Sequence, residues 1–135
     1  MMSKQEVDDE RKRSEGDPLI RNRLRQARAE MARHRMMEAV PQADVIITNP
    51  THYSVALRYE RNTNAAPEVV AKGMDDMAMR IRELARDNDV PLLEDPPLAR
   101  ALFAAVKVGQ EVPARFYEAV ATVLSHVYQL KNSVA

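Results

Sequence analysis

An asparagine followed by a proline, Asn49-Pro50, stands directly after the apolar stretch 44–48. The next backbone nitrogen commonly attacks an asparagine side chain, but proline carries no N–H, so this route is blocked. The reverse attack remains open. The Asn49 side-chain nitrogen closes a five-membered succinimide ring on its own backbone carbonyl carbon and expels the nitrogen of Pro50. The sequence therefore predicts that the chain cuts its own backbone once, between Asn49 and Pro50, with no outside nucleophile.

The residues around this pair decide between cleavage and an ordinary turn, which Asn-Pro also favours. Apolar and polar residues alternate after the loop, in the pattern of a half-buried strand. The residues on its apolar face are Tyr53, Val55, Leu57 and Tyr59. Two strands joined by so short a connection form a stiff loop, which can hold Asn49 in a strained geometry for attack. We therefore favour cleavage over a plain turn.

Three further loop residues are candidates for the same site. Pro50 supplies the leaving nitrogen, and the Thr51 hydroxyl is expected to shape the turn. Histidine is the side chain that exchanges protons near neutral pH, and His52 is the third residue after the expected cut. It donates a proton to the departing nitrogen, polarises the Asn49 carbonyl, or only holds the loop in shape, and the sequence leaves these roles open.

The elements that must position this loop are predicted by hydrophobic periodicity. Strands interleaved with helices indicate an α/β domain, a small four-stranded mixed sheet surrounded by helices and preceded by an extended N-terminal helix. The predicted strands cover 44–48, 53–59, 69–71 and 91–94, and the predicted helices cover 19–40, 74–88, 97–108 and 113–132. We expect Gly73 to end the third strand, Asp75 and Asp76 to lie in the first turn of the following helix, where its dipole favours anions, and Asp95 to cap the next helix.

The chain is expected to divide into residues 1–40, a linker and N-terminal helix, and residues 41–135, the self-cleaving domain. The N-terminal helix has an apolar stripe and many arginines. The stripe consists of Ile20, Leu24, Ala27 and Met31. Its basic residues form either a solvated face or a contact with anionic lipid, where each cation contributes about 1 kcal/mol.

Composition argues against several other functions. The 20 basic and 20 acidic residues cancel, so no overall attraction to nucleic acid is expected. Without cysteine, disulfides and thiolate metal sites are impossible, and the three histidines stand in separate segments. The three glycines are too widely spaced for a phosphate-binding loop, and no apolar run approaches the ~20 residues that span a bilayer. We expect no metal and no cofactor.

Three motifs, at 49–57, 69–73 and 96–102, together resemble the cytoplasmic domain of the FlhB/YscU family. Members of this family are self-cleaving switch proteins of type III secretion, and the resemblance extends over nearly the whole chain. The second motif favours the flagellar branch over the injectisome branch. The resemblance also implies an N-terminal membrane domain that precedes this chain, and hence a place on the cytoplasmic face of the bacterial inner membrane.

The resemblance implies a single-turnover function rather than an enzyme acting on other substrates. Cleavage would permit a change of export from rod and hook subunits to filament subunits, while the pieces 1–49 and 50–135 stay together. The implied partners are other export-gate membrane proteins with their cytoplasmic domains, a hook-length ruler protein and early rod and hook substrates. Two alternatives remain, an injectisome counterpart with the same chemistry and an interaction module whose turn never cuts.

The resemblance finally implies a shallow apolar patch that docks early export substrates. The matching positions are Ala66 and Pro67 in a loop, with Ala121 and Leu124 on the last helix. The alternative is that Ala121 and Leu124 are ordinary core residues, which helical periodicity alone favours.

Overall fold

The computed structural model describes residues 16–50, 52–63 and 65–133. The chain divides into two compact units, one up to Arg35 and one from Met36 onward. Helix α2, Pro18–Ala39, begins in the first unit and ends in the second. None of the α2 residues is buried, and in the predicted apolar stripe Leu24, Ala27 and Met31 are exposed while Ile20 is half-buried. Within the described ranges, no helix is long and apolar enough to cross a membrane.

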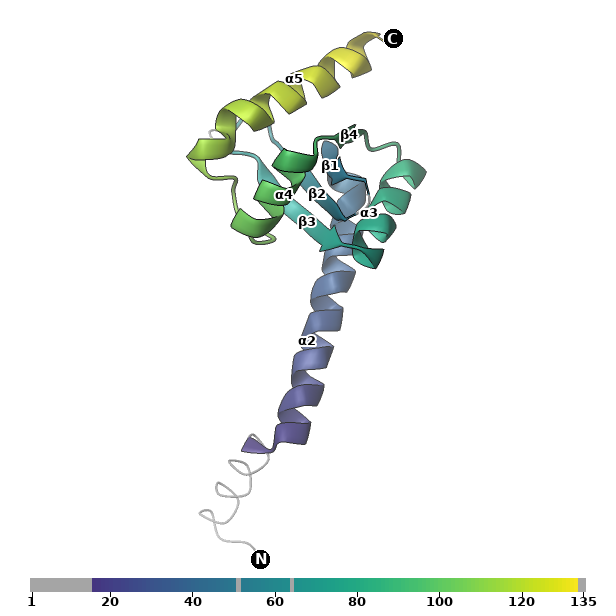
Figure 1. Ribbon diagram of the computed structural model, residues 1–135, viewed down its shortest axis with the longest axis vertical. Coiled ribbons are helices and arrows are strands. Elements are labelled where there is room, and N and C mark those ends of the chain that lie inside the picture. Colours follow the sequence, from purple (N-terminus) through teal and green to yellow (C-terminus); the bar gives the residue numbers. More distant parts are fainter. Residues whose placement is uncertain (1–15, 51, 64, 134–135) are drawn as a thin grey trace, which may run out of the picture. The chain divides into compact units, whose positions relative to one another are not determined.

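The second unit is built on a sheet with strand order β3-β2-β1-β4 (Figure 1). The strands are β1, Val45–Asn49, β2, Tyr53–Arg58, β3, Glu68–Met74, and β4, Leu92–Glu94. β2 pairs antiparallel with both β1 and β3, whereas β1 and β4 are parallel. Over the described residues, this confirms the predicted α/β fold with a four-stranded mixed sheet and a preceding N-terminal helix. The first two strands meet at the Asn-Pro-Thr-His loop, as the sequence predicts.

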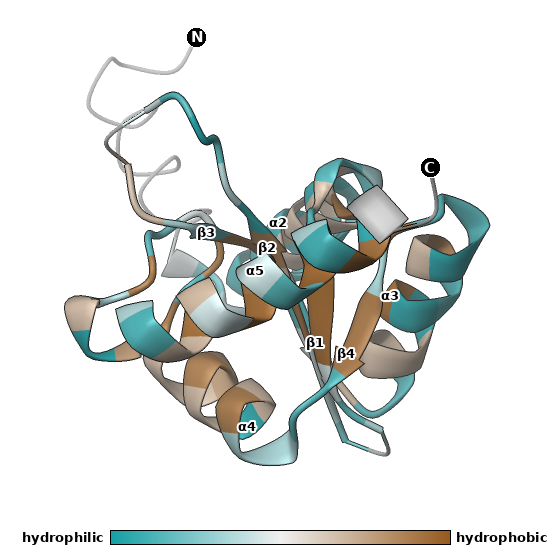
Figure 2. Cartoon of the chain, turned by 90° about the horizontal axis from the view of Figure 1, so that it is seen from above, coloured by the Kyte–Doolittle hydropathy of each residue, from teal (hydrophilic) through white to brown (hydrophobic). Residues whose placement is uncertain are grey.

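Helices cover both faces of the sheet and turn their apolar sides toward it (Figure 2). They are α3, Asp76–Asp87, α4, Pro96–Ala105, and α5, Tyr117–Ser133, with single 3-10 turns at Val40–Gln42 and Ala114–Phe116. Residues of α4 and α5 form one core with Ile47 and Val55 of the sheet. Residues of α3 form a second core with Ile46 and Ala56 on the opposite face. The sheet is therefore the middle layer of three.

Burial on both faces corrects the prediction that the second strand is half-buried. Its alternation is real, but Ser54 and Ala56 on the supposed polar face are fully buried, because α3 covers them. The Ser54 hydroxyl donates a hydrogen bond to the Ala78 carbonyl of α3 at 3.0 Å. A small hydroxyl that finds such a partner can be buried at little cost, and this explains how a polar residue fits there.

Gly73 does not end the third strand, which continues to Met74. The strand is longer than predicted because its last residues continue the ladder with β2, where Ser54 pairs with Gly73. A Cβ at Gly73 would lie 2.5 Å from Met77 Cγ, so the glycine permits the close approach of α3. Because β3 is longer, α3 begins at Asp76, and Asp75 precedes the helix instead of lying in its first turn.

The start of α4 follows the prediction more closely. The Asp95 side chain accepts a hydrogen bond from the Leu98 N–H at 3.3 Å, which confirms the predicted N-cap. The helix ends at Ala105 rather than just before Gly109. Gly109 lies instead in the following turn at φ +88°, a left-handed conformation that glycine adopts without strain.

Candidate functional site

The Asn-Pro-Thr-His loop joins two adjacent strands at one end of the sheet. Asn49 is the last residue of β1 and pairs with Tyr53, the first residue of β2. Asn49 is half-buried, while Pro50 and His52 are exposed. Thr51, the fourth predicted site residue, lies outside the described residues. The ladder thus fixes both ends of a three-residue connection next to the Asn49-Pro50 bond.

The carbonyl of Asn49 is hydrogen-bonded within the loop. The backbone N–H of His52 donates to this oxygen at 3.0 Å. The same carbonyl carbon carries the bond to Pro50, and attack on it would move negative charge onto its oxygen. A donor already placed at that oxygen stabilises such a charge as it develops. The arrangement therefore suits a nucleophilic attack on the Asn49 carbonyl.

Neighbouring segments hold the two sides of the loop. On one side, the Asp95 N–H donates to the Thr48 carbonyl at 2.9 Å. On the other side, the Asp75 N–H donates to the His52 carbonyl, also at 2.9 Å. The loop is thus attached to the residues that follow β4 and β3, as well as to its own two strands. These attachments reduce its freedom to leave a given geometry.

Asp75 also contacts the side chain of His52. Its Oδ1 lies 3.5 Å from His52 Nδ1, with both side chains mostly exposed, at 62% and 63%. An exposed pair of this kind contributes only about 0–1 kcal/mol to stability. Asp75 also has φ +52°, a backbone conformation that costs a non-glycine residue roughly 1–3 kcal/mol. The sequence prediction placed Asp75 in a helix and missed this contact, because the extension of β3 to Met74 depends on pairing with β2.

The residues on the N-terminal side of the candidate cut are anchored in the core. Val45, Ile46 and Ile47 of β1 are fully buried. They lie between β2 and β4 in the sheet, and none of these ladder contacts passes through the Asn49-Pro50 bond.

The four residues predicted to form an apolar patch line one groove of about 380 Å³. Ala66 and Pro67 are half-buried, Ala121 is exposed, and Leu124 is 4% exposed and belongs to the core. Three tyrosines that are not among the positions implied by the family resemblance line the same groove. They are Tyr59, Tyr117 and Tyr128. Aromatic rings beside small apolar residues give a surface suited to an apolar side chain of a partner.

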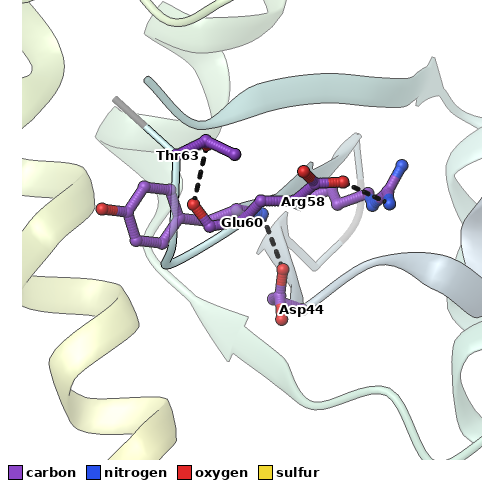
Figure 3. Close-up of polar contacts among 5 residues, drawn as sticks. Asp44, Arg58, Glu60 and Thr63 are labelled. Carbon is purple, nitrogen blue, oxygen red and sulfur yellow. Dashed lines mark hydrogen bonds and ion pairs between the residues drawn. The ribbon is translucent and has the colours of Figure 1, made fainter. Parts of the chain in front are cut away.

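Residues 58–63, which precede the groove residues Ala66 and Pro67, are held by polar contacts at the end of β2 (Figure 3). The Tyr59 N–H donates to Asp44 Oδ2 at 2.6 Å, and Arg58 pairs with Glu60 at 2.7 Å. The Thr63 hydroxyl donates to the Glu60 carbonyl at 3.0 Å. These bonds shape the turn that leads to Ala66 and Pro67. At the groove edge, the guanidinium of Arg61 lies 3.6 Å from the centre of the Tyr128 ring, a cation–π distance.

Possible metal ligands are scattered among the described residues. They contain no group of three or more His, Asp or Glu side chains that could hold an ion. His52 has one carboxylate beside it, that of Asp75, which is too few ligands for a zinc site.

The fold and the loop define a class of protein, a small α/β domain in which an inner strand of the sheet ends at an Asn-Pro pair and the exposed residues Pro50 and His52 follow it. The chain belongs to the FlhB HrpN YscU SpaS family, whose family model matches residues 1–127. It is 56% identical over 131 residues to the flagellar biosynthetic protein FlhB of Escherichia coli (strain K12) and 50% identical over 133 residues to that of Bacillus subtilis (strain 168). These alignments cover 97% and 98% of this chain but 34% and 37% of the relatives. The chain thus spans about a third of the length of these proteins.

Solved structures confirm the fold assignment. The crystal structure of the cytoplasmic domain of FlhB from Shewanella putrefaciens superposes with a TM-score of 0.71 at 46% sequence identity, covering 75% of this chain and 78% of that domain. The C-terminal domain of a mutated EscU superposes with a TM-score of 0.65 at 33% identity, covering 68% of this chain and 92% of that domain. Both the sequence relatives and these structures bear out the family resemblance.

Proposed function

We propose that this chain is the cytoplasmic part of a flagellar type III export protein that cuts its own backbone between Asn49 and Pro50. The observation that supports the proposal most strongly is the environment of the Asn49 carbonyl. This carbonyl is joined to proline, held at the end of a paired strand, and already hydrogen-bonded to the His52 N–H at 3.0 Å. Family membership and the names of the flagellar relatives support the same assignment.

The proposed reaction needs only groups of the chain itself. The Asn49 Nδ2 forms a bond to the Asn49 carbonyl carbon, and the bond from that carbon to the Pro50 nitrogen breaks. One proton leaves Nδ2 and one reaches the Pro50 nitrogen, so the step requires no added reagent. The products are a succinimide at the end of residues 1–49 and a free amine on Pro50. The His52 side chain supplies the proton to the leaving nitrogen.

The stiffness of the loop supplies much of the rate. An amide nitrogen is a poor nucleophile, and each 1.36 kcal/mol removed from the barrier is worth about tenfold in rate. Fixing the attacking and attacked groups in advance removes entropy that ring closure would otherwise cost. The bonds from Asp75 and Asp95 to the two sides of the loop supply this constraint.

In the proposed role, cleavage changes which substrates the export apparatus accepts, from rod and hook subunits to filament subunits. The protein would act at the cytoplasmic face of the inner membrane, beside other export-gate proteins and a hook-length ruler protein. Cutting frees the loop while the buried residues of β1 keep both pieces in one domain. A local change of this kind alters a surface without unfolding the fold that presents it. The flagellar relatives favour this role over an injectisome one.

A denaturing gel of purified protein tests the chemistry. Wild type should separate into pieces of 49 and 86 residues, with the larger piece beginning at Pro50. Asn49→Ala should remain one band, because it lacks the attacking nitrogen, and Asn88→Ala is the matched control that should cut like wild type. A wild-type chain that stays whole through long incubation would contradict the proposal.

We propose further that the groove at Ala66, Pro67, Ala121 and Leu124 docks early rod and hook substrates through an apolar side chain. A carboxylate in the groove would lose its hydration when the partner covers it, and this costs several kcal/mol. Ala66→Asp should therefore reduce binding of purified rod or hook subunits by at least about a hundredfold, with little change in the melting temperature. The control is Ala119→Asp, an exposed alanine of α5 that is not among the groove residues. Equal binding by both variants would refute this assignment.

A further inference from the structure

One residue outside the loop touches His52 at two separate points. The Asp75 N–H donates to the His52 carbonyl at 2.9 Å, and Asp75 Oδ1 lies 3.5 Å from His52 Nδ1. The backbone contact fixes where residue 52 lies, and the side-chain contact restricts how its ring is turned. A single residue thus constrains both the main chain and the imidazole of His52.

Asp75 stands at the N-cap of α3 but does not act as a cap. Aspartate at this place usually accepts a hydrogen bond from a backbone N–H in the first helical turn. Asp95 does so at the start of α4, where its Oδ1 accepts from the Leu98 N–H. Within the part of the chain that the structure describes, the Asp75 side chain caps no N–H of α3. Its carboxylate is directed to His52 instead.

The backbone of Asp75 is also strained. Its φ of +52° and ψ of −117° lie where glycine is the usual residue. Glycine at this place would remove the strain but would leave His52 without the carboxylate. An unfavourable residue that holds a candidate catalytic group is typical of a functional position rather than of a structural one.

We propose that Asp75 is a positioning residue for self-cleavage, holding the His52 ring and backbone so that residue 52 serves the Asn49-Pro50 bond. The inference rests on the proposed function. Its role follows from geometry, because a misplacement of about 1 Å in a reacting assembly costs roughly a hundredfold in rate. The contacts between Asp75 and His52 also connect the loop to the start of α3. A partner that moves the start of α3 would therefore change the cleavage rate.

The test uses the whole chain and the substitution Asp75→Gly, which removes the carboxylate and relieves the backbone strain. We expect cleavage to slow by at least about tenfold, while the melting temperature stays the same or rises. The matched control is Asp89→Gly. Asp89 also has a positive φ, of +58°, and lies in the turn after α3, away from the loop in sequence. It should gain similar stability and cut at the wild-type rate.

Two further measurements separate positioning from general support of the fold. In a His52→Ala background, Asp75→Gly should cause no additional slowing, because the group it positions is gone. In the uncleavable Asn49→Ala background, NMR should show that Asp75→Gly shifts the ring signals of His52. The signals of His34 and His126 should stay unchanged and serve as internal references.

Each result has a defined meaning. Slow cleavage by Asp75→Gly with unchanged or raised stability, dependent on His52, supports the inference. Cleavage at the wild-type rate, slowing with a matching fall in melting temperature, or equal slowing in the His52→Ala background would each overturn it. If wild type itself fails to cut, the proposed function falls and takes this inference with it. If wild type cuts and the variant does too, only the role of Asp75 is wrong.

Discussion

Ile47→Ala tests whether β1 holds the two pieces of a cut chain together. Ile47 is 0% exposed and lies in β1, an inner strand of the sheet, where it pairs with Val55 on one side and Leu93 on the other. Truncating a buried isoleucine to alanine removes apolar contacts and leaves a cavity, and this costs about 2–5 kcal/mol. A unit of this size has a total stability of only about 5–15 kcal/mol. The substitution therefore removes a large fraction of what keeps the strand in place.

Urea unfolding measures the effect in the uncleavable Asn49→Ala background, where the transition concerns a single chain. With a denaturant slope of about 1–3 kcal/mol/M, a loss of 3 kcal/mol lowers the midpoint by roughly 1–3 M. The matched control is Met79→Ala in α3, whose side chain is 48% exposed. It should change stability by no more than about 0.5 kcal/mol.

In the cleaved protein, the two pieces should elute together on size exclusion until the sheet unfolds. With Ile47→Ala, the two pieces should separate at a lower urea concentration, and the difference from wild type should about equal the shift of the unfolding midpoint. An unchanged midpoint for Ile47→Ala would refute the view that burial of Ile47 supplies a large part of the stability. Wild-type pieces that separate in buffer alone would refute the view that β1 remains buried after the cut.

Two other substitutions test the packing and the cap. Gly73→Ala places a methyl group 2.5 Å from Met77 Cγ, so it should destabilise the fold by about 1–3 kcal/mol in a thermal melt, whereas Gly16→Ala, with open space around it, should not. Asp95→Ala removes the acceptor for the Leu98 N–H and should cost about 1 kcal/mol, and a loss below the error of the melt would show that the cap contributes nothing.

Much of this fold follows from local sequence signals. The apolar run before Asn49 predicts a strand buried on both faces, and this is what β1 is. Asp95 followed by two prolines predicts a capped helix start. This prediction succeeds because capping and proline geometry depend only on neighbouring residues. The family resemblance also led to the groove residues, which stand far apart in the sequence and meet only in the fold.

The features that the sequence could not predict depend on long-range contacts. Ser54 looked like a solvent-facing residue, and only the packing of α3 on that face explains its burial. Gly73 looked like the end of a strand, but pairing with β2 continues the ladder past it. Because β3 extends further than predicted, Asp75 precedes α3 and its side chain contacts His52. This contact joins residues 23 positions apart and carries no periodic signal.

Intact-mass measurement of freshly purified protein, followed over time without protease, tests the central claim most directly. Cyclisation of Asn49 predicts two species whose masses together equal that of the whole chain, since the 1–49 piece first carries a succinimide and no water is added. Hydrolysis of the succinimide should add one water to that piece later. Pieces that contain the extra water from the earliest time point, or a chain that stays whole, would contradict self-cleavage by the Asn49 side chain.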